Sequence, residues 1–148
     1  MLRLILLVLC AAVAALAAVG VGGEVGTPSR DGRAERSCVT PAGVARISFS
    51  STRYPHIRRH FEAAVARGWP AVLLLNRDGA DRRRERLLDA YRTRPGRDRD
   101  EYPPAVARRH WRADVAYVPS AENRSHGSTL GIKLRRFCDG TRFRYVFY

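Results

Sequence analysis

The sequence has no apolar stretch long enough to cross a membrane. Its longest uncharged apolar run extends from Leu4 to Val19, which is shorter than the roughly 20 residues that a spanning helix needs. Arg3 precedes this run, and the small residues around Ala15 and Ala17 suit a cleavage site. We therefore interpret residues 1–17 as a secretory signal peptide. This interpretation predicts a secreted, extracellular protein with no membrane attachment once the signal is removed.

Lysine is nearly absent, and acidic residues are too few to balance the basic ones. Lys133 is the only lysine among 27 Lys and Arg residues, against 14 Asp and Glu, so the formal net charge is +13. Loss of the signal peptide would remove only Arg3 from this charge. A charge of this size favours a polyanionic partner, and a guanidinium group can hold a phosphate through two hydrogen bonds at once. A GC-rich genome would also explain the preference for arginine over lysine, but not the net charge.

Cysteine is scarce, which restricts the disulfides that the protein can form. One of the three cysteines, Cys10, belongs to the predicted signal peptide, which leaves Cys38 and Cys138 in the exported chain. An even number in an oxidising compartment predicts that they pair. A bridge closing a loop of about 100 residues would contribute roughly 4–5 kcal/mol by restricting the unfolded chain. The alternative is two free buried thiols.

Neither an internal repeat nor a low-complexity tract is present, and the chain is too short for a second domain. Residues 18–36 are rich in glycine, alanine and charge and show no apolar periodicity, which is typical of a flexible lead-in. We therefore expect one domain, over residues 37–148.

The spacing of apolar residues within this domain predicts both strands and helices. Alternation indicates an edge strand at 44–50 and a closing strand at 142–148, while the continuous apolar run at 71–75 suits a central strand and 115–118 another. Helical spacing predicts helices from Pro55 up to Gly68, over 81–88, and from Ser120 to Phe137. The expected fold is a small α+β domain around one antiparallel sheet.

Residues 97–103 form the densest cluster of mixed charge in the chain. The carboxylates of Asp98, Asp100 and Glu101 would repel a phosphate backbone unless a cation lay between them. A divalent metal held by oxygen atoms would resolve this conflict and activate water, and the ligands available favour Mg²⁺ or Mn²⁺ over Zn²⁺. The alternative is a solvated loop of alternating charges with no chemical role.

A second candidate feature is the start of the last predicted helix. The N-terminus of a helix attracts phosphate through its free N–H groups and its dipole. Asn123 could offer its amide oxygen to a metal, and Arg124 could hold a phosphate. The alternative is simple capping, with Ser120 as the N-cap and Glu122 or Asn123 satisfying free amides.

Taken together, these features have the order of a known family. An acidic segment, a hairpin strand and a helix with asparagine in its first turn are similar to the layout of the ββα-metal nucleases. The ordered motifs resemble more closely the NucA/NucB family of secreted bacterial deoxyribonucleases, over nearly the whole chain after the signal. These motifs are Arg53-Tyr54-Pro55, Arg77 with Gly79-Ala80-Asp81, Arg94-Pro95-Gly96, Asp98-Arg99-Asp100-Glu101-Tyr102-Pro103, Asp114-Val115, Ser120, Asn123-Arg124, Gly127-Ser128, Gly131 and Asp139-Gly140-Thr141-Arg142.

The resemblance implies a non-specific endonuclease that acts on extracellular DNA with one divalent metal and a ββα-metal core. It implies that Asp100 is the general base, in place of the histidine of most ββα-metal nucleases, and that Glu101 orients water or metal. It also implies that Asn123 is a metal ligand. Which of the acidic residues touches the metal stays open. The arginines assigned by the resemblance to the substrate phosphate are Arg99, Arg124 and Arg77.

The chain departs from the family pattern in two places. Residues 108–112 are bulkier and more basic than the glycine-rich turn expected there, and Pro104 follows Pro103 where a larger apolar residue is usual. These departures predict a different grip on the substrate but remove no catalytic position.

The histidines and the loop aromatics each allow a structural and a functional interpretation. His56 and His60 are spaced i, i+4 on a helix, which can bind a metal, but no third ligand is near, so we expect both at the surface. His126 is the alternative base if the acidic assignment fails. His110 and Trp111 could stack on a base, although packing against the sheet is the simpler expectation.

Two other functions agree with parts of the pattern. One is a non-catalytic cationic DNA-binding or antimicrobial protein, and the other is a small metal-free ribonuclease that uses Glu and His. The leading hypothesis is a monomeric nuclease with DNA as substrate, RNA as the alternative substrate and a proteinaceous inhibitor as a candidate partner.

Overall fold

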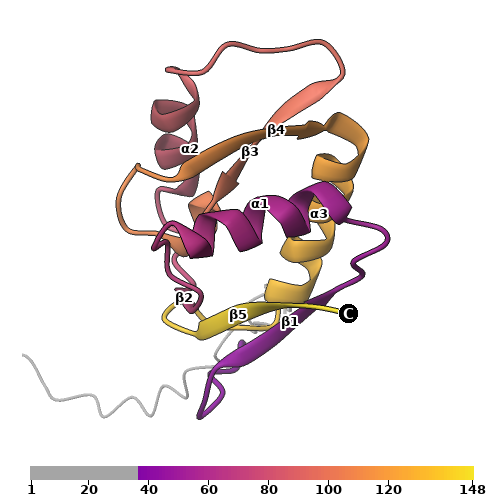
Figure 1. Cartoon of the computed structure of the whole chain (residues 1–148). Helices are drawn as coiled ribbons and strands as arrows, with labels where there is room; N and C mark the ends of the chain where they lie inside the picture. The colour runs from indigo at the N-terminus through magenta and orange to yellow at the C-terminus, as the bar shows by residue number, and fades with distance from the viewer. Residues whose placement is uncertain (1–36) are drawn as a thin grey trace, which may run out of the picture. The chain divides into compact units, whose positions relative to one another are not determined.

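The computed structural model describes residues 37–148, so the predicted signal peptide and lead-in (residues 1–36) lie outside the described part. The elements follow one another as β1 (Ala45–Phe49), α1 (Pro55–Ala66), β2 (Leu73–Leu74), α2 (Ala80–Leu88), β3 (Arg97–Tyr102), the 3₁₀ turn η1 (Ala105–Ala107), β4 (Asp114–Pro119), α3 (Ser120–Leu134) and β5 (Arg142–Phe147) (Figure 1). Between residues 37 and 148, no helix is long and apolar enough to cross a membrane.

The strands form two sheets. One has the order β1-β5-β2, with β1 parallel and β2 antiparallel to β5, and the other is the antiparallel hairpin of β3 and β4. The expected α+β class is confirmed, and β3, β4 and α3 form a ββα unit. The expectation of one antiparallel sheet with residues 71–75 at its centre is wrong. Only Leu73 and Leu74 pair with β5, and Ala71 and Val72 are exposed, so a continuous apolar run here does not mean burial on both faces.

Two helices separate the sheets. Figure 1 shows α1 and α3 between the β3–β4 hairpin and the three-stranded sheet, and both helices contact the hairpin. In α1 the predicted face is confirmed, because Ile57 and Ala64 are buried and Phe61 and Val65 pack against the core. Pro55 lies in the first turn of α1, and Gly68 follows its end with a φ of 93°, which residues with a side chain rarely adopt.

The alternation of β5 places its aromatic side chains in the core. Phe143 is fully buried and Tyr145 is 7% exposed, and they pack with Ile47 and Phe49 of the neighbouring strand β1. The intervening Arg142 and Arg144 are exposed on the other face of the sheet. The period of two in this strand therefore assigns one face to the core and the other to solvent.

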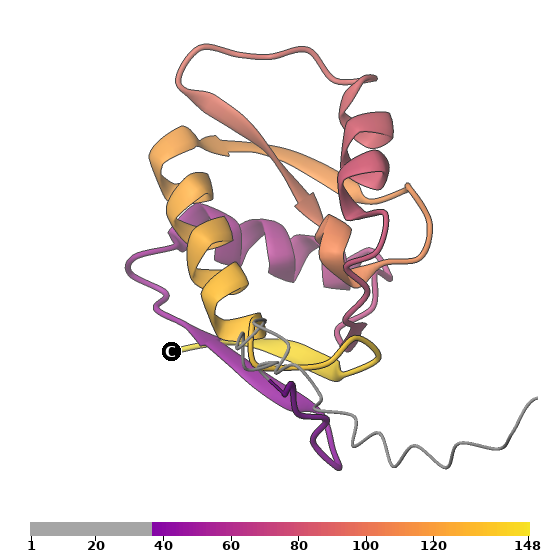
Figure 2. The same cartoon turned by 180° about the vertical axis from the view of Figure 1, so that it is seen from behind.

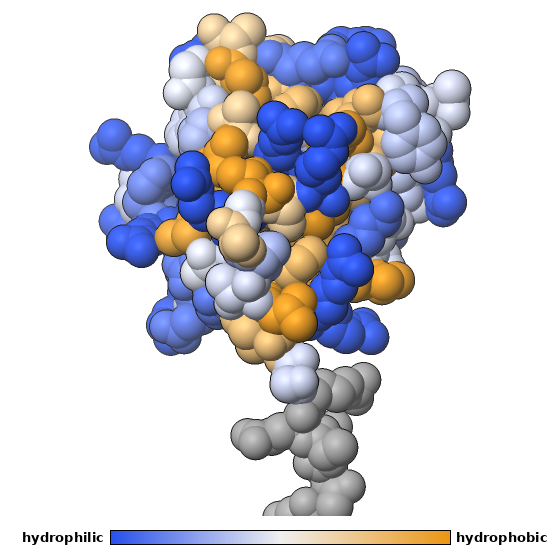
Figure 3. All heavy atoms as spheres, turned by 90° about the horizontal axis from the view of Figure 1, so that it is seen from below, coloured by the Kyte–Doolittle hydropathy of each residue, from blue (hydrophilic) through white to orange (hydrophobic). Residues whose placement is uncertain are grey.

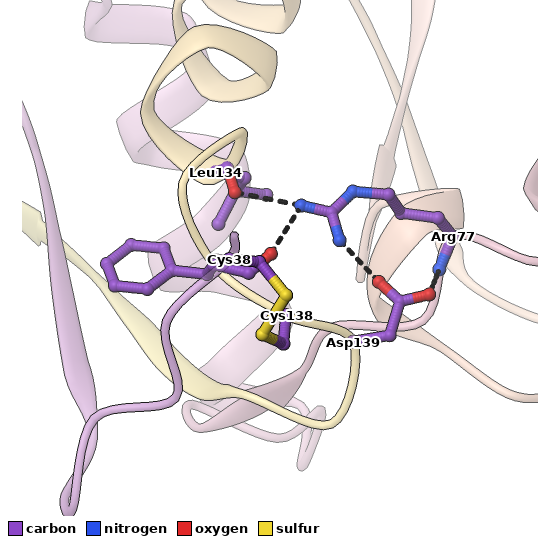
Figure 4. Close-up of a disulfide and its surroundings, with 6 residues drawn as sticks. Cys38, Arg77, Leu134, Cys138 and Asp139 are labelled. Atoms are coloured by element: carbon purple, nitrogen blue, oxygen red, sulfur yellow. Dashed lines mark hydrogen bonds and ion pairs between the residues drawn. A yellow bond between two sulfur atoms is a disulfide. The ribbon is translucent and has the colours of Figure 1, made fainter. Parts of the chain in front are cut away.

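The predicted disulfide is confirmed. Cys38 and Cys138 are bonded, with their Cα atoms 4.9 Å apart, and they join the segment before β1 to the segment after α3. Figure 4 shows Arg77 beside this bridge, with its guanidinium donating to the carbonyl oxygen of Leu134, at the end of α3, and to the carboxylate of Asp139. A third bond runs from the same guanidinium to the carbonyl oxygen of Phe137. The bridge and Arg77 together hold the C-terminal end of α3.

We predict that the protein without residues 1–17 shows no free thiol when it is denatured without reductant. Replacing both Cys38 and Cys138 with serine should lower the free energy of unfolding by about 4–5 kcal/mol, because the bridge closes a long loop in the unfolded chain. Urea denaturation of the oxidised, reduced and doubly substituted proteins measures this loss. Two titratable thiols, or equal stability of the three proteins, would contradict the prediction.

Candidate active site

A cavity of about 440 Å³ opens beside β3, between α2 and α3. In Figure 2 β3 runs between these two helices, and Ile57, Phe61 and Tyr145 contribute apolar atoms to the cavity wall. Most of the site residues predicted from the sequence meet here. The polar residues that line the cavity are Asp81, Arg84, Asp98, Arg99, Asp100, Glu101, Asn123, Arg124, His126 and Ser128.

The acidic residues lie on a strand and not on a loop. Residues 97–102 pair with β4 in regular antiparallel register, with Asp100 opposite Ala116 and Glu101 opposite Val115. Since successive side chains of a strand point to opposite faces, Asp98 and Asp100 contact α3 and α1, whereas Glu101 contacts α2 and the segment after η1. The alternative of a solvated loop without contacts is therefore wrong.

Asp100 is bonded to a buried histidine of α1. The Nδ1 atom of His60 donates to Oδ2 of Asp100 over 2.6 Å, and its Nε2 atom lies 3.6 Å from Oδ2 of Asp114 on β4. Arg67 in turn pairs with the carboxylate of Asp114. The side chain of His60 is 3% exposed, so its expected place at the surface is wrong. The signal was present in the sequence, because residue 60 lies on the same helix face as Ile57 and Ala64.

The first turn of α3 contacts both α1 and β3. Oε1 of Glu122 accepts hydrogen bonds from the backbone N–H groups of His56 and Ile57, and Oε2 lies 2.7 Å from Nδ1 of His56. Glu122 therefore caps the N-terminus of α1, and His56 is half-buried beside it. The expectation that Ser120 caps α3 is wrong. Ser120 is the first helical residue, and its hydroxyl donates to Asp98 over 2.7 Å.

Asp98 is held by cationic and hydroxyl donors. Nε of Arg124 donates to Oδ2 of Asp98 over 3.0 Å, and this bond, together with that from Ser120, keeps the pKa of the Asp98 carboxyl below its usual value. The side chain of Arg124 is 76% exposed at the cavity rim. Arg124 can therefore reach a phosphate while it remains close to Asp98.

Glu101 is buried between two guanidinium groups. Nη2 of Arg108 donates to Oε2 of Glu101 over 2.6 Å, and Nη1 of Arg84 donates to Oε1 over 3.2 Å. Burial lowers the pKa of Arg108, and the charge of Glu101 opposes this shift. Arg84 is half-exposed and also lines the cavity. The carboxylate of Glu101 thus has its charge balanced by the chain itself.

Two of the arginines predicted to bind phosphate are bonded to backbone carbonyls. Nη1 of Arg99 donates to the carbonyl oxygens of Leu88 and Tyr91 at the end of α2, although Arg99 also lines the cavity. Arg77 does not line the cavity, and its guanidinium is occupied by Asp139 and by the end of α3. Arg77, which the resemblance assigned to the substrate phosphate, therefore lies outside the cavity lining and contacts the end of α3.

His126 lies in the cavity wall but is almost completely covered. It is 4% exposed and packs against the rings of Phe49, Tyr54 and Tyr145. Burial lowers its pKa, with the charges of Asp100 and Glu122 acting in the opposite direction. Its Nε2 atom has no hydrogen-bond partner among the described residues.

The donor groups of the cavity fit a hard divalent cation. No group of three or more His, Cys, Asp or Glu residues suited to a metal is found within residues 37–148. The cavity instead brings together the carboxylates of Asp98 and Asp100 and the amide of Asn123. Mg²⁺ is commonly held by one or two carboxylates with several waters, so this oxygen set agrees with Mg²⁺ or Mn²⁺ and not with a four-ligand zinc site.

The sequence of the chain is similar to that of a bacterial nuclease. No protein-family model matches the sequence. Over 101 residues the chain is 37% identical to the DNA-entry nuclease of Bacillus subtilis (strain 168), a match that covers 68% of this chain and 69% of that protein. The chain belongs to the NucA/NucB family of nucleases. The resemblance seen in the motifs is thereby confirmed.

In this NucA/NucB nuclease the fold brings Asp100, Glu101, Asn123, Arg99 and Arg124 to one cavity and leaves Arg77 outside it. Sequence reasoning missed the partners of the acidic residues. In a chain with so many arginines, nothing in the sequence distinguished Arg84 and Arg108 as partners of Glu101. Glu122 was expected to cap its own helix, α3, but it caps α1. Their roles depend on contacts between elements distant in the chain.

We predict that Arg108→Met lowers the free energy of unfolding by about 3–5 kcal/mol, because it leaves the buried Glu101 with only the half-exposed Arg84 as partner. Arg84→Met is the matched control and should cost less than about 1 kcal/mol, since its guanidinium is half-exposed. Urea denaturation measures both. Equal losses for the two variants would show that burial does not distinguish these ion pairs.

Proposed function

We propose that the protein is a secreted, non-specific, metal-dependent endodeoxyribonuclease that hydrolyses phosphodiester bonds at the cavity beside β3. The observation that supports this proposal most strongly is that Asp100 and Asn123, 23 positions apart in the chain, line one cavity together with Arg84 and Arg124. A general base, an oxygen ligand and phosphate-binding cations are the groups that such a reaction needs.

Asp100 is proposed as the general base. Its Oδ2 atom accepts the hydrogen bond from His60, while Oδ1 accepts none from the described residues and can receive a proton from water. His60 donates through Nδ1, because an ionised carboxylate can only accept. The histidine therefore fixes the orientation of the carboxylate from behind. Its Nε2 atom lies 3.6 Å from Asp114, which is beyond hydrogen-bond distance, and Arg67 pairs with Asp114.

Asn123 is proposed as a metal ligand, with a carboxylate oxygen of Asp98 or Asp100 as the second protein ligand. When bound, Mg²⁺ or Mn²⁺ would supply positive charge at the scissile phosphate and lower the pKa of water. Glu101 has a different role in this proposal, because its carboxylate is already neutralised by Arg108 and Arg84. It positions these two arginines and one wall of the cavity, instead of binding the metal directly.

The exposed guanidinium groups at the rim are proposed to hold the DNA backbone. Arg84 and Arg124 line the cavity from opposite sides, on α2 and α3, and their side chains are 52% and 76% exposed. Contacts of this kind fix a phosphate without reading the bases, which supports cleavage without sequence preference. The name of the Bacillus subtilis relative supports DNA as the substrate.

Secretion is proposed from two observations that are independent of the site. The first is the signal-like pattern of residues 1–17, and the second is the disulfide, which is typical of oxidising compartments.

The other two functions have less support. Membership in a nuclease family argues against a purely cationic binding protein. A metal-free ribonuclease would need a Glu and a His that are free to act as acid and base. Glu101 and His126 line the cavity, but Glu101 is bonded to Arg108 and Arg84, and His126 is 4% exposed.

We predict that EDTA abolishes cleavage of plasmid DNA and that added Mg²⁺ or Mn²⁺ restores it. Asp100→Ala should lower kcat by roughly 10²- to 10⁴-fold, as expected for loss of a general base, and Asn123→Ala should also remove most of the turnover. Both variants should keep the fold and their affinity for DNA. Glu62→Ala, which removes an exposed carboxylate of α1, is the control and should cleave at the wild-type rate. Cleavage that survives EDTA, or full activity in either variant, would refute the corresponding role.

We also predict a strong salt dependence of DNA binding. With six to ten phosphates contacted, affinity should fall roughly 10³- to 10⁵-fold between about 50 and 200 mM salt, because each neutralised phosphate releases counterions. Fluorescence anisotropy with labelled duplex DNA in the presence of EDTA measures binding without cleavage. An affinity that hardly changes over this range would exclude arginine-dominated binding.

A further inference from the structure

On the outer face of the three-stranded sheet, the described strands carry arginines, and none of their residues is an Asp or Glu. Arg46 of β1 and Arg142 and Arg144 of β5 are exposed on this face, opposite the buried aromatic side chains of the same strands. No Asp or Glu occurs in residues 37–61, 123–138 or 140–148, which include both of these strands and most of α3. Figure 3 views the molecule from this side and shows strongly hydrophilic residues standing among apolar ones.

Two of these arginines are direct neighbours across the strand pair. Arg46 lies opposite Arg144 in the parallel register of β1 and β5. Neither takes part in an ion pair within the described residues, where the paired arginines are Arg58, Arg67, Arg77, Arg84, Arg108 and Arg124. Like charges placed side by side on neighbouring strands destabilise a sheet. The stability of the fold therefore does not explain this pair.

The basic surface continues around the free edge of β1. A hollow of about 320 Å³ lies between this edge and the end of α3, lined by Arg46, Ile47, Ser48, Ile132, Lys133 and Arg136. Nζ of Lys133 donates to the carbonyl of Ser48 over 2.6 Å, and the guanidinium of Arg136 lies 4.7 Å from the ring centre of Phe137. These contacts hold two further cations next to Arg46. We call Arg46, Lys133, Arg136, Arg142 and Arg144 the outer basic face.

We infer that the outer basic face binds the phosphate backbone of a second segment of polymeric nucleic acid, while the first segment occupies the cavity. This inference rests on the proposed function, because it takes the nuclease substrate as the polyanion. The two sites are separated by the sheet itself. Tyr145 lines the cavity from the inner face of β5, and its neighbour Arg144 points away from it.

The chemistry of the face identifies the class of ligand. Guanidinium and ammonium groups without carboxylates favour a dense row of phosphates, and they recognise no base sequence. A second attachment point raises the effective concentration of a long polymer at the enzyme. A duplex too short to reach both sites gains nothing from it. The inference therefore predicts an effect that depends on the length of the DNA.

The test compares two triple variants with equal loss of charge. Arg46→Gln, Arg136→Gln and Arg144→Gln together remove charge from the outer basic face. Arg58→Gln, Arg59→Gln and Arg92→Gln together remove the same charge from exposed positions elsewhere. Binding is measured in EDTA with duplexes of about 10 and about 200 base pairs, the shorter spanning only about 34 Å. Urea denaturation checks that both variants are folded.

The outer-face variant should lose about tenfold or more in affinity for the long duplex, and its salt-dependence slope should fall by about two to three, as expected for three lost phosphate contacts. Its binding and Mg²⁺-dependent cleavage of the short duplex should stay at the level of the control variant. Equal losses for the two variants on long DNA would overturn the inference. A matching loss on the short duplex would also overturn it, because the face would then be part of the cavity track.

Two further outcomes separate this inference from its alternatives. If the wild-type protein with Mg²⁺ or Mn²⁺ cuts neither plasmid DNA nor the long duplex, the proposed function fails, whereas the length-dependent binding in EDTA can still be present. Vesicles containing phosphatidylglycerol provide the last comparison. If the outer-face variant loses vesicle binding but retains the affinity of the control for long DNA, the face recognises an anionic lipid surface and the inference is wrong.

Discussion

Each carboxylate of β3 is bonded to a donor from a different part of the chain. Asp98 is held by Arg124 of α3, Asp100 by His60 of α1, and Glu101 by Arg108 and by Arg84 of α2. A row of carboxylates beside a phosphate-binding surface costs free energy unless each charge is compensated. The compensating groups come from α1, α2, α3 and the segment after η1. The contacts that neutralise the carboxylates therefore also attach the β3–β4 hairpin to these elements. All three carboxylates line the cavity beside β3.

The arginines at and near the cavity include two groups that composition does not distinguish. Arg77, Arg83, Arg99 and Arg108 donate to backbone carbonyls of loops and helix ends, and they act as structural cross-links. Arg84 and Arg124 pair with acids of β3 but remain half-exposed or more at the cavity rim. A planar guanidinium with several donors suits both tasks. A high arginine content therefore overstates the number of side chains that are free to bind phosphate.

β5 connects the core to both of the proposed binding surfaces. Its inward residues Phe143 and Tyr145 are buried, and Tyr145 forms part of the cavity wall. Its outward residues Arg142 and Arg144 belong to the outer basic face. One strand with a period of two thus separates the side of the molecule that carries the cavity from a second, basic side. The disulfide and Arg77 connect the end of α3 to the segments on either side of the sheet.

The sequence alone was sufficient for the features that depend on local pattern. Spacing predicted the period of two in β5, the apolar face of α1 and the α+β class. It also predicted that α1 begins at Pro55 and ends before Gly68. The pairing of Cys38 with Cys138 followed from their number. The family followed from the order of motifs, because that order survives even where single motifs are weak. Asp100 and Asn123, which were expected to share a site, line the same cavity.

Tertiary structure decided which partner each polar side chain meets. His60 was expected at the surface and lies buried behind Asp100, Glu122 caps α1 and not its own helix, and Arg77 supports the end of α3. It also decided that the strands form two sheets instead of one. Spacing along a chain specifies which face of an element is apolar, but hydrogen bonds and ion pairs join atoms that are dozens of residues apart. Their identity is set only when the packed elements bring those atoms within 3 Å or so of one another.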